Sequence, residues 1–147
     1  MHGKKLKNLS IQKVSITAIA SISSLGKDQE TIWKHYVAEN ASITKERLKE
    51  QEALVSRISD QDREAIHLLK EENAKYKDLD LSVLYALYAS RVAVSKARWS
   101  EHDIFGINIG SSRGATALFE KYHEYFLDNG KSETLSSPTT TLGNISS

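Results

Sequence analysis

Apolar and polar residues alternate in one short stretch near the start of the chain. Lys13 to Ile19 reads Lys-Val-Ser-Ile-Thr-Ala-Ile, and this period of two predicts a β-strand. A turn over 21–26 follows, and Asp28 then stands where a helix N-cap is expected. The apolar residues behind it recur at helical spacing: Ile32, Trp33, Tyr36 and Val37. The pattern therefore predicts a strand, a turn and an amphipathic helix.

The segment 44–77 is dominated by Lys, Glu and Arg, and its apolar residues are sparse. Ser59 or Asp60 suits the N-cap of a helical piece in the second half of this segment. That piece carries three apolar residues, Ile66, Leu68 and Leu69. We expect one or two surface helices or a loosely packed excursion, with the charges facing solvent.

The strongest predicted helix runs from Asp80 to Trp99 and is apolar over most of its circumference. Asp78 or Asp80 is suited to cap its start, and Lys96 complements the negative end of its dipole. A helix this apolar is expected to be buried or to lie at an interface.

A second strand is predicted at Ile104–Ile109, because this run is short, apolar and rich in β-branched residues. Gly110-Ser-Ser-Arg-Gly then forms a turn, without the Gly-Lys-Ser/Thr ending of a phosphate loop. A helix follows over Ala115–Asp128, and Gly130 suits a left-handed C-cap. The order of elements predicts an α/β fold with a mostly parallel sheet. Two strands are too few for a stable sheet, so we expect further chain or a partner to complete it.

Composition narrows the classes of function. The chain has 147 residues with a net charge of +1, so one domain is expected, with no electrostatic footprint for nucleic acid. No run of apolar residues approaches the length of a membrane span, and a cytoplasmic location is expected. The absence of cysteine excludes disulfides, thiolate metal sites and a cysteine nucleophile within these residues.

Several stretches of the chain follow the order of a known family. The first is Val14-Ser-Ile-Thr-Ala-Ile-Ala-Ser-Ile-Ser-Ser-Leu-Gly, which resembles the first strand and turn of beta-ketoacyl synthases. Ala18 and Ala20 stand in place of two family glycines, and Ser24 stands in place of a proline. Trp33 matches a Trp of the first helix, and the segment 80–97 looks like the helix before the second strand. The segments 107–114 and 137–147 resemble the Gly-rich turn and the stretch leading into the next helix, whereas 44–77 matches poorly.

This resemblance implies a thiolase-like α/β/α/β/α fold, of which residues 1–147 would be the N-terminal part of the first half. It implies a homodimer, or a heterodimer with a related synthase subunit, that condenses an acyl thioester with malonyl-acyl carrier protein. The reaction uses no metal or cofactor and belongs to fatty-acid or polyketide/polyene-type biosynthesis. In that chemistry a Cys thiolate takes the acyl chain, while two His and a Lys promote decarboxylation. Those residues lie further along in the family, so we expect no catalytic residue here and no activity of this chain alone.

The resemblance places the substrate-binding candidates at the wall of an acyl pocket: Arg113, Thr139, Thr140, Thr141 and Asn144. Arg113 departs from the small or apolar residue usual at its position, and it could narrow the pocket, select a short or polar chain, or pair across the dimer. The three threonines and the asparagine equally suit capping of a helix start. The histidines lack triad-like neighbours, and we expect His35, His67 and His123 near the solvent border of helices and His102 in a loop.

Two other functions stay open. Synthase families include Cys-less subunits that work by pairing with an active subunit, and this chain would then be such a non-catalytic partner. Alternatively, the segment 80–99 could serve as the docking face of a helical interaction module. The coding sequence beyond Ser147 discriminates best among the synthase, the partner subunit and the interaction module. Of these, only the synthase requires a Cys and His-containing motifs.

Overall fold

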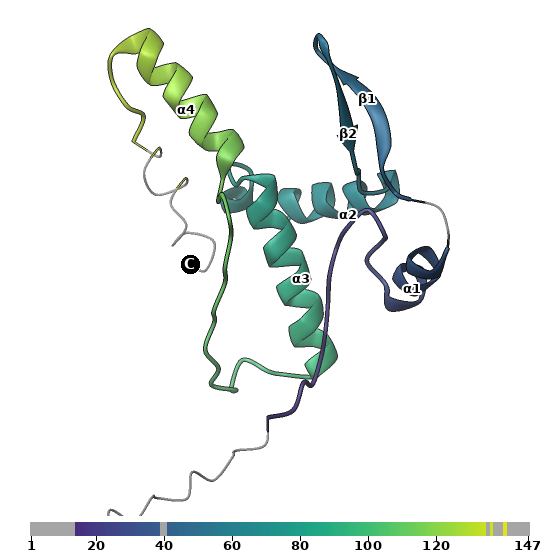
Figure 1. Ribbon diagram of the computed structural model, residues 1–147. Coiled ribbons are helices and arrows are strands. Elements are labelled where there is room, and N and C mark those ends of the chain that lie inside the picture. The colour runs from purple at the N-terminus through teal and green to yellow at the C-terminus, as the bar shows by residue number, and fades with distance from the viewer. Residues whose placement is uncertain (1–13, 39–40, 135, 137–139, 141–147) are drawn as a thin grey trace, which may run out of the picture.

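The helix α3, Leu81–Ala97, is the longest helix in the computed structural model, which describes residues 14–38, 41–134, 136 and 140 (Figure 1). The Asp80 carboxylate caps its start by accepting from the Ser82 N–H at 2.8 Å and from the Ser82 hydroxyl at 2.7 Å. The left-handed Arg98, at φ 57°, ends it. The predicted helix and its Asp80 cap are confirmed.

The core lies where α2, Asp60–Glu71, packs against α3. Ser59 caps α2 by accepting from the Asp62 N–H at 3.1 Å, as predicted. Each helix contributes apolar residues from one face, and the 3₁₀ helix η1, Ala74–Tyr76, connects the two helices. The buried apolar residues of the described chain are Ile66, Leu69, Val83, Leu84, Ala115 and Tyr122. This core is small for a chain of this length.

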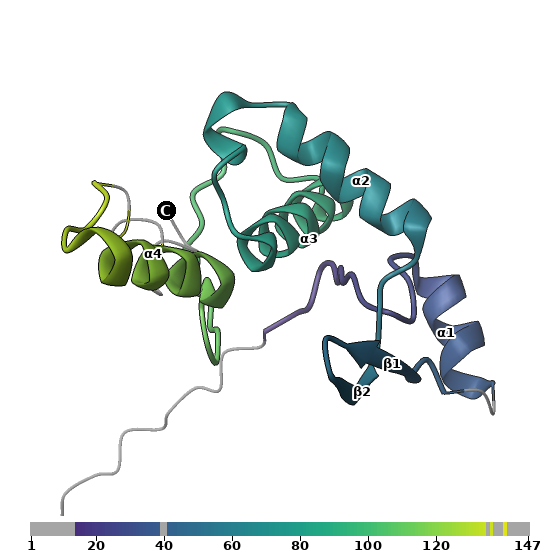
Figure 2. The same cartoon turned by 90° about the horizontal axis from the view of Figure 1, so that it is seen from above.

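The helix α1, Gln29–Val37, begins at Asp28, whose carboxylate accepts from the Thr31 N–H at 2.8 Å. Figure 2 shows the start of α2 close to α1. The buried Asp62 holds the two together through an ion pair with Lys27 at 3.1 Å. The predicted helix and its cap are confirmed here too, but its Trp33 stays 64% exposed.

An antiparallel hairpin follows α1 and projects beyond α2 in Figure 1. Its strands are β1, Thr44–Leu48, and β2, Gln51–Val55, in a register that pairs Thr44 with Val55. Lys49, at φ 57°, takes the left-handed conformation in the two-residue turn. Three serine hydroxyls hydrogen-bond at the base of the hairpin: Ser24, Ser42 and Ser56.

Surface helices were expected over 44–77. This expectation holds for α2, but residues 44–55 form the hairpin instead. The sequence 44–55 satisfies its charges across the strands, where Lys45 pairs with Glu52 at 3.7 Å. Glu46 similarly meets Arg57, just beyond β2. Opposite charges across two strands stabilise a sheet, just as opposite charges at i,i+4 stabilise a helix. A high density of charged residues is therefore compatible with either structure.

The two strands predicted at 13–19 and 104–109 are also corrected. Lys13 lies outside the described residues, and residues 14–22 and 104–110 run without regular secondary structure or a strand partner (Figure 1). The side chains are exposed, with Val14 at 90% and Ile104 at 103%, so the second segment is not buried either. An apolar pattern makes a strand only when a neighbouring backbone supplies hydrogen-bond partners, and none does so in the described chain.

The fold therefore mixes helix and strand, as expected, but the mostly parallel sheet is wrong. The sheet of the described residues is the antiparallel β1–β2 pair alone. The last described helix, α4, runs over Thr116–Asn129 and ends at the left-handed Gly130, as predicted. Of its expected apolar stripe only Tyr122 is buried, while Phe119 is 59% exposed. None of the described helices is long and apolar enough to cross a membrane.

Leu84 is fully buried between α2 and α3, and we expect Leu84→Ala to lower the free energy of unfolding by about 3 kcal/mol, as cavity-forming substitutions do. The control is Leu68→Ala on the outer face of α2, where Leu68 is 60% exposed. That variant should stay within about 0.5 kcal/mol of the parent. Urea denaturation followed by circular dichroism measures both, and equal losses would contradict the position of the core.

Hydrogen bonding from Thr31 lowers the pKa of Asp28 below its ordinary value of 3.8. The carboxylate therefore stabilises the fold above that value, and this contribution is lost as the pH falls through the lower folded pKa. Asp28→Asn keeps the cap acceptor but not the charge, so its free energy of unfolding should fall less steeply on acidification.

The matched control for Asp28 is Asp128→Asn in the last turn of α4, where a carboxylate opposes the helix dipole. It should cause no loss of stability at neutral pH. Thermal melts of the three proteins between about pH 6 and about pH 2 compare their slopes. If the stability of Asp28→Asn depended on pH as steeply as that of the parent, the proposed link between Asp28 ionisation and the stability of α1 would be refuted.

Candidate functional site

The Gly-rich turn at 110–114 is held in shape by the hydroxyl of Ser111 and by its last glycine, Gly114. Ser111 Oγ accepts from the Gly114 N–H at 2.9 Å, and Gly114 takes the left-handed conformation at φ 67°. The buried Gly114 also lies against the start of α3, where its carbonyl is 3.5 Å from Ser82 Oγ. The turn is thus fixed to α3, directly before α4.

Arg113 extends from this turn into solvent and is exposed. It makes no ion pair with any described residue. The structure therefore leaves its guanidinium accessible to a ligand or to a further part of the protein. It does not place Arg113 inside a cavity of the described chain.

Of the other substrate-binding candidates, only Thr140 lies in the described part of the chain. It is half-buried and helical, and its hydroxyl donates to the Ser136 carbonyl at 2.5 Å. This bond to the residue four positions earlier is typical of a threonine within a helix, so Thr140 does not act as an N-cap here. Thr139, Thr141 and Asn144 lie outside the described residues.

The four described histidines lie apart from one another at the surface. His35 Nδ1 lies 2.8 Å from the Leu25 carbonyl, and His123 stacks on Phe119 with ring centroids 6.1 Å apart. His67 and His102 are exposed as well. No group of His, Cys, Asp or Glu within the described ranges is arranged to hold a metal ion.

One groove, of about 490 Å³, runs along the extended N-terminal segment. The backbone of 16–21 forms one side, and α1 contributes Gln29 and Ile32. Lys96 of α3 closes the groove and donates from Nζ to the Ile19 carbonyl at 3.4 Å.

A second groove, of about 500 Å³, lies between α2 and α3. Its charged lining residues are all cationic, Arg57, Arg63 and Lys70, and His67 lies among them. Its apolar lining is formed by Ile58, Ile66, Leu81, Leu84 and Tyr85. We name this feature the basic groove. The sequence analysis missed it, although Arg63, His67 and Lys70 recur at i, i+4 and i+7 and so share one face of α2.

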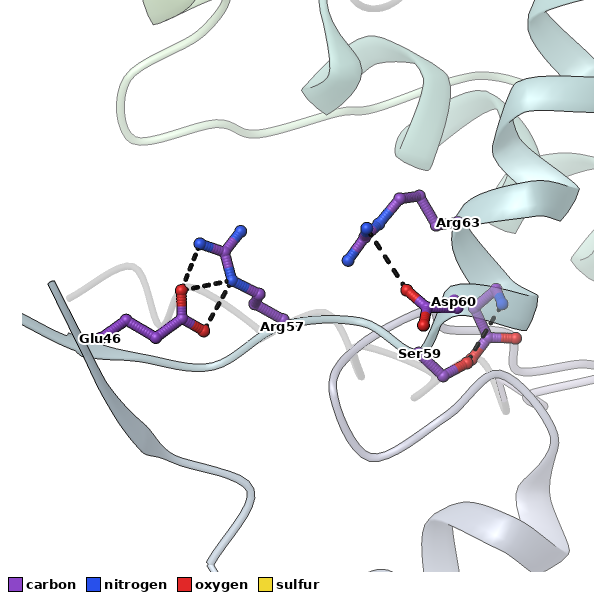
Figure 3. A network of polar contacts seen from close by, with 6 residues as sticks. Glu46, Arg57, Ser59, Asp60 and Arg63 are labelled. Atoms are coloured by element: carbon purple, nitrogen blue, oxygen red, sulfur yellow. Dashed lines mark hydrogen bonds and ion pairs between the residues drawn. The ribbon is translucent and has the colours of Figure 1, made fainter. Parts of the chain in front are cut away.

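Figure 3 shows Glu46 beside Arg57 and Asp60 beside Arg63, so that carboxylates meet two of the cations that line the basic groove. Glu46 accepts from Arg57 Nε at 2.8 and 2.9 Å and from its terminal nitrogen at 2.5 Å. This hydrogen bonding lowers the pKa of Glu46 and raises that of Arg57. Arg63 pairs with Asp60 at 3.3 Å. His67 and Lys70, by contrast, have no carboxylate partner among the described residues.

No protein-family model matches this chain, and a search of curated proteins gave no match either.

Proposed function

We propose that this chain is the N-terminal part of a beta-ketoacyl synthase, where it supplies scaffold and a wall of the acyl pocket. The proposal is supported by the resemblance of 14–26, 80–97 and 107–114 to that family. One structural observation carries it furthest. Two apolar segments that the sequence predicts as strands run extended and unpaired. The first contacts α3, and the turn that follows the second lies against the start of α3.

The contacts define a strand-helix-strand path. The first segment contacts the C-terminal end of α3 through the bond between Ile19 and Lys96. The second leaves α3 after Arg98, where Trp99 packs on Phe105 with ring centroids 5.0 Å apart, and reaches the start of α3 again at Gly114. It thus returns along a helix of 17 residues, about 25 Å long. A strand-helix-strand unit of an α/β protein follows the same path.

The exposed apolar residues also support further strands beside these segments. Six apolar residues of the described chain are buried, whereas eighteen large hydrophobic residues are exposed. Several of the exposed ones lie on the unpaired segments, including Ile16 at 80% and Ile107 at 63%. Strands from a further part of the synthase would pair these backbones and cover these side chains.

In this proposal the chemistry is carried by residues outside this chain. The Cys nucleophile, two His and a Lys follow in the longer protein, which acts as a dimer on acyl carrier protein substrates. The turn at 110–114 positions Arg113 at the acyl pocket, where the guanidinium limits the length of the acyl chain. The thiolase-like arrangement of the full sheet belongs to the same proposal.

We expect the purified 147-residue chain to form no beta-ketoacyl product from acyl- and malonyl-acyl carrier protein, because it has no cysteine to take the acyl group. Protein expressed from the extended reading frame should form that product and lose it when its Cys is replaced by Ala. Turnover by the short chain would refute the proposal. A reading frame without the Cys would favour the non-catalytic partner subunit.

Arg113→Ala in the longer protein should raise kcat/KM for the longest acyl chains by about tenfold and leave short chains unchanged. The matched control is Arg47→Ala on the exposed face of β1, which removes the same charge far along the chain from the turn. Assays with acyl chains of several lengths give the profile. The same profile for parent and Arg113→Ala would rule out the gating role of Arg113.

A further inference from the structure

We propose that the basic groove between α2 and α3 binds an amphipathic anion, that is, a carboxylate or phosphate attached to an aliphatic body. This inference is independent of the synthase proposal, because it uses only the residues that line the groove. The groove has the size of small-molecule sites, at about 500 Å³. It also separates charge and apolar surface in the way that such a ligand requires.

The charge of the groove has one sign. Arg57, Arg63 and Lys70 line it together with His67, and no carboxylate does. The chain as a whole is nearly neutral, at +1, so this arrangement is local and is not a consequence of composition. Cations grouped on a partly apolar surface favour an anion, since the surface lowers the local dielectric and strengthens the attraction.

His67 and Lys70 are the residues that hold the headgroup. Glu46 already occupies Arg57, and Asp60 is placed on Arg63. Lys70 is half-buried and His67 is exposed, and both line the groove. Neither has a carboxylate partner in the described chain. The Asp60 carboxylate is 96% exposed, so its pair with Arg63 is weak and Arg63 can also turn toward a bound anion.

The aliphatic body of the ligand would lie on the apolar lining. Leu81 is 56% exposed at the start of α3, and Tyr85 follows one turn later on the same helix. The half-buried Ile58 continues this surface toward α2. Covering these side chains with a hydrocarbon removes apolar surface from water, whereas a free inorganic anion would gain only the charged contacts.

The test is titration calorimetry of the 147-residue chain with decanoate and decyl phosphate below their micelle concentrations. Both ligands carry a negative headgroup on an aliphatic chain, which is the chemistry that the groove is proposed to recognise. The ligand that binds more tightly shows whether a carboxylate or a phosphate is preferred. The double variant His67→Gln/Lys70→Gln should bind about tenfold more weakly, as expected for loss of charged hydrogen bonds. Leu81→Ser should also weaken binding, because it removes part of the apolar lining.

The matched control is Lys121→Gln/His123→Gln, which removes the same residue types from α4, where both are exposed. It should bind like the parent. Equal weakening by control and test variants would overturn the site, and so would decanol binding as tightly as decanoate. Inorganic phosphate binding as tightly as decyl phosphate would overturn the role of the apolar lining.

A second measurement locates the ligand at low protein concentration. A decanoate analogue with a diazirine on its chain should crosslink to peptides that contain 56–58 or 81–85, and excess decanoate should remove the label. Far-ultraviolet circular dichroism verifies that every variant keeps the parent's helix content. Label that falls mainly along 16–21, at the other groove, would overturn the assignment.

Discussion

The contact between α2 and α3 is the interaction on which the rest of the described structure depends. It buries Ile66 and Leu69 against the side of α3 that carries Val83 and Leu84. With α3 held in this way, the same two helices form the walls of the basic groove. Polar contacts on either side, such as the pair between Lys27 and Asp62, add to this attachment. Loss of the apolar contact would remove the buried centre of the described fold.

Local chemistry made the helices predictable. Asp28, Ser59 and Asp80 each accept a hydrogen bond from the first turn of a helix, because a short side chain at this position can reach an otherwise unpaired N–H. Gly130 ends α4 because glycine takes the left-handed conformation without steric cost. In these cases, the residues that decide the structure lie within one helical turn of it.

Strands were not predictable in the same way, because their partners are distant or absent. Residues 104–109 have the apolar composition of a buried strand, yet Ile104 is fully exposed where no backbone pairs with it. Residues 44–55 have the charge density of a surface helix, yet they fold on themselves through Lys49 and the pairing of β1 with β2. Helix propensity is a weak preference, and cross-strand contacts override it.

The candidate site was predicted only in part, for a related reason. The resemblance directed attention to Arg113, and the turn around it does form, held by Ser111 and Gly114. The basic groove went unnoticed because its lining comes from three places in the sequence, before α2, on α2 and on α3. The charges at 63, 67 and 70 were visible as a helical stripe, but the apolar surface opposite them appears only when α3 is in place.

The apolar circumference of α3 connects the core with the unpaired segments. A helix with one covered face needs one apolar stripe, but α3 is apolar on almost every side. Its contact with α2 accounts for Val83 and Leu84, while Leu87, Tyr88, Val92 and Val94 remain half-buried. The first extended segment contacts the C-terminal end of α3, and the turn that follows the second lies against its start. Strands added to those segments would cover the remaining sides of α3, so the helix that organises this core has the composition of one placed against a larger sheet.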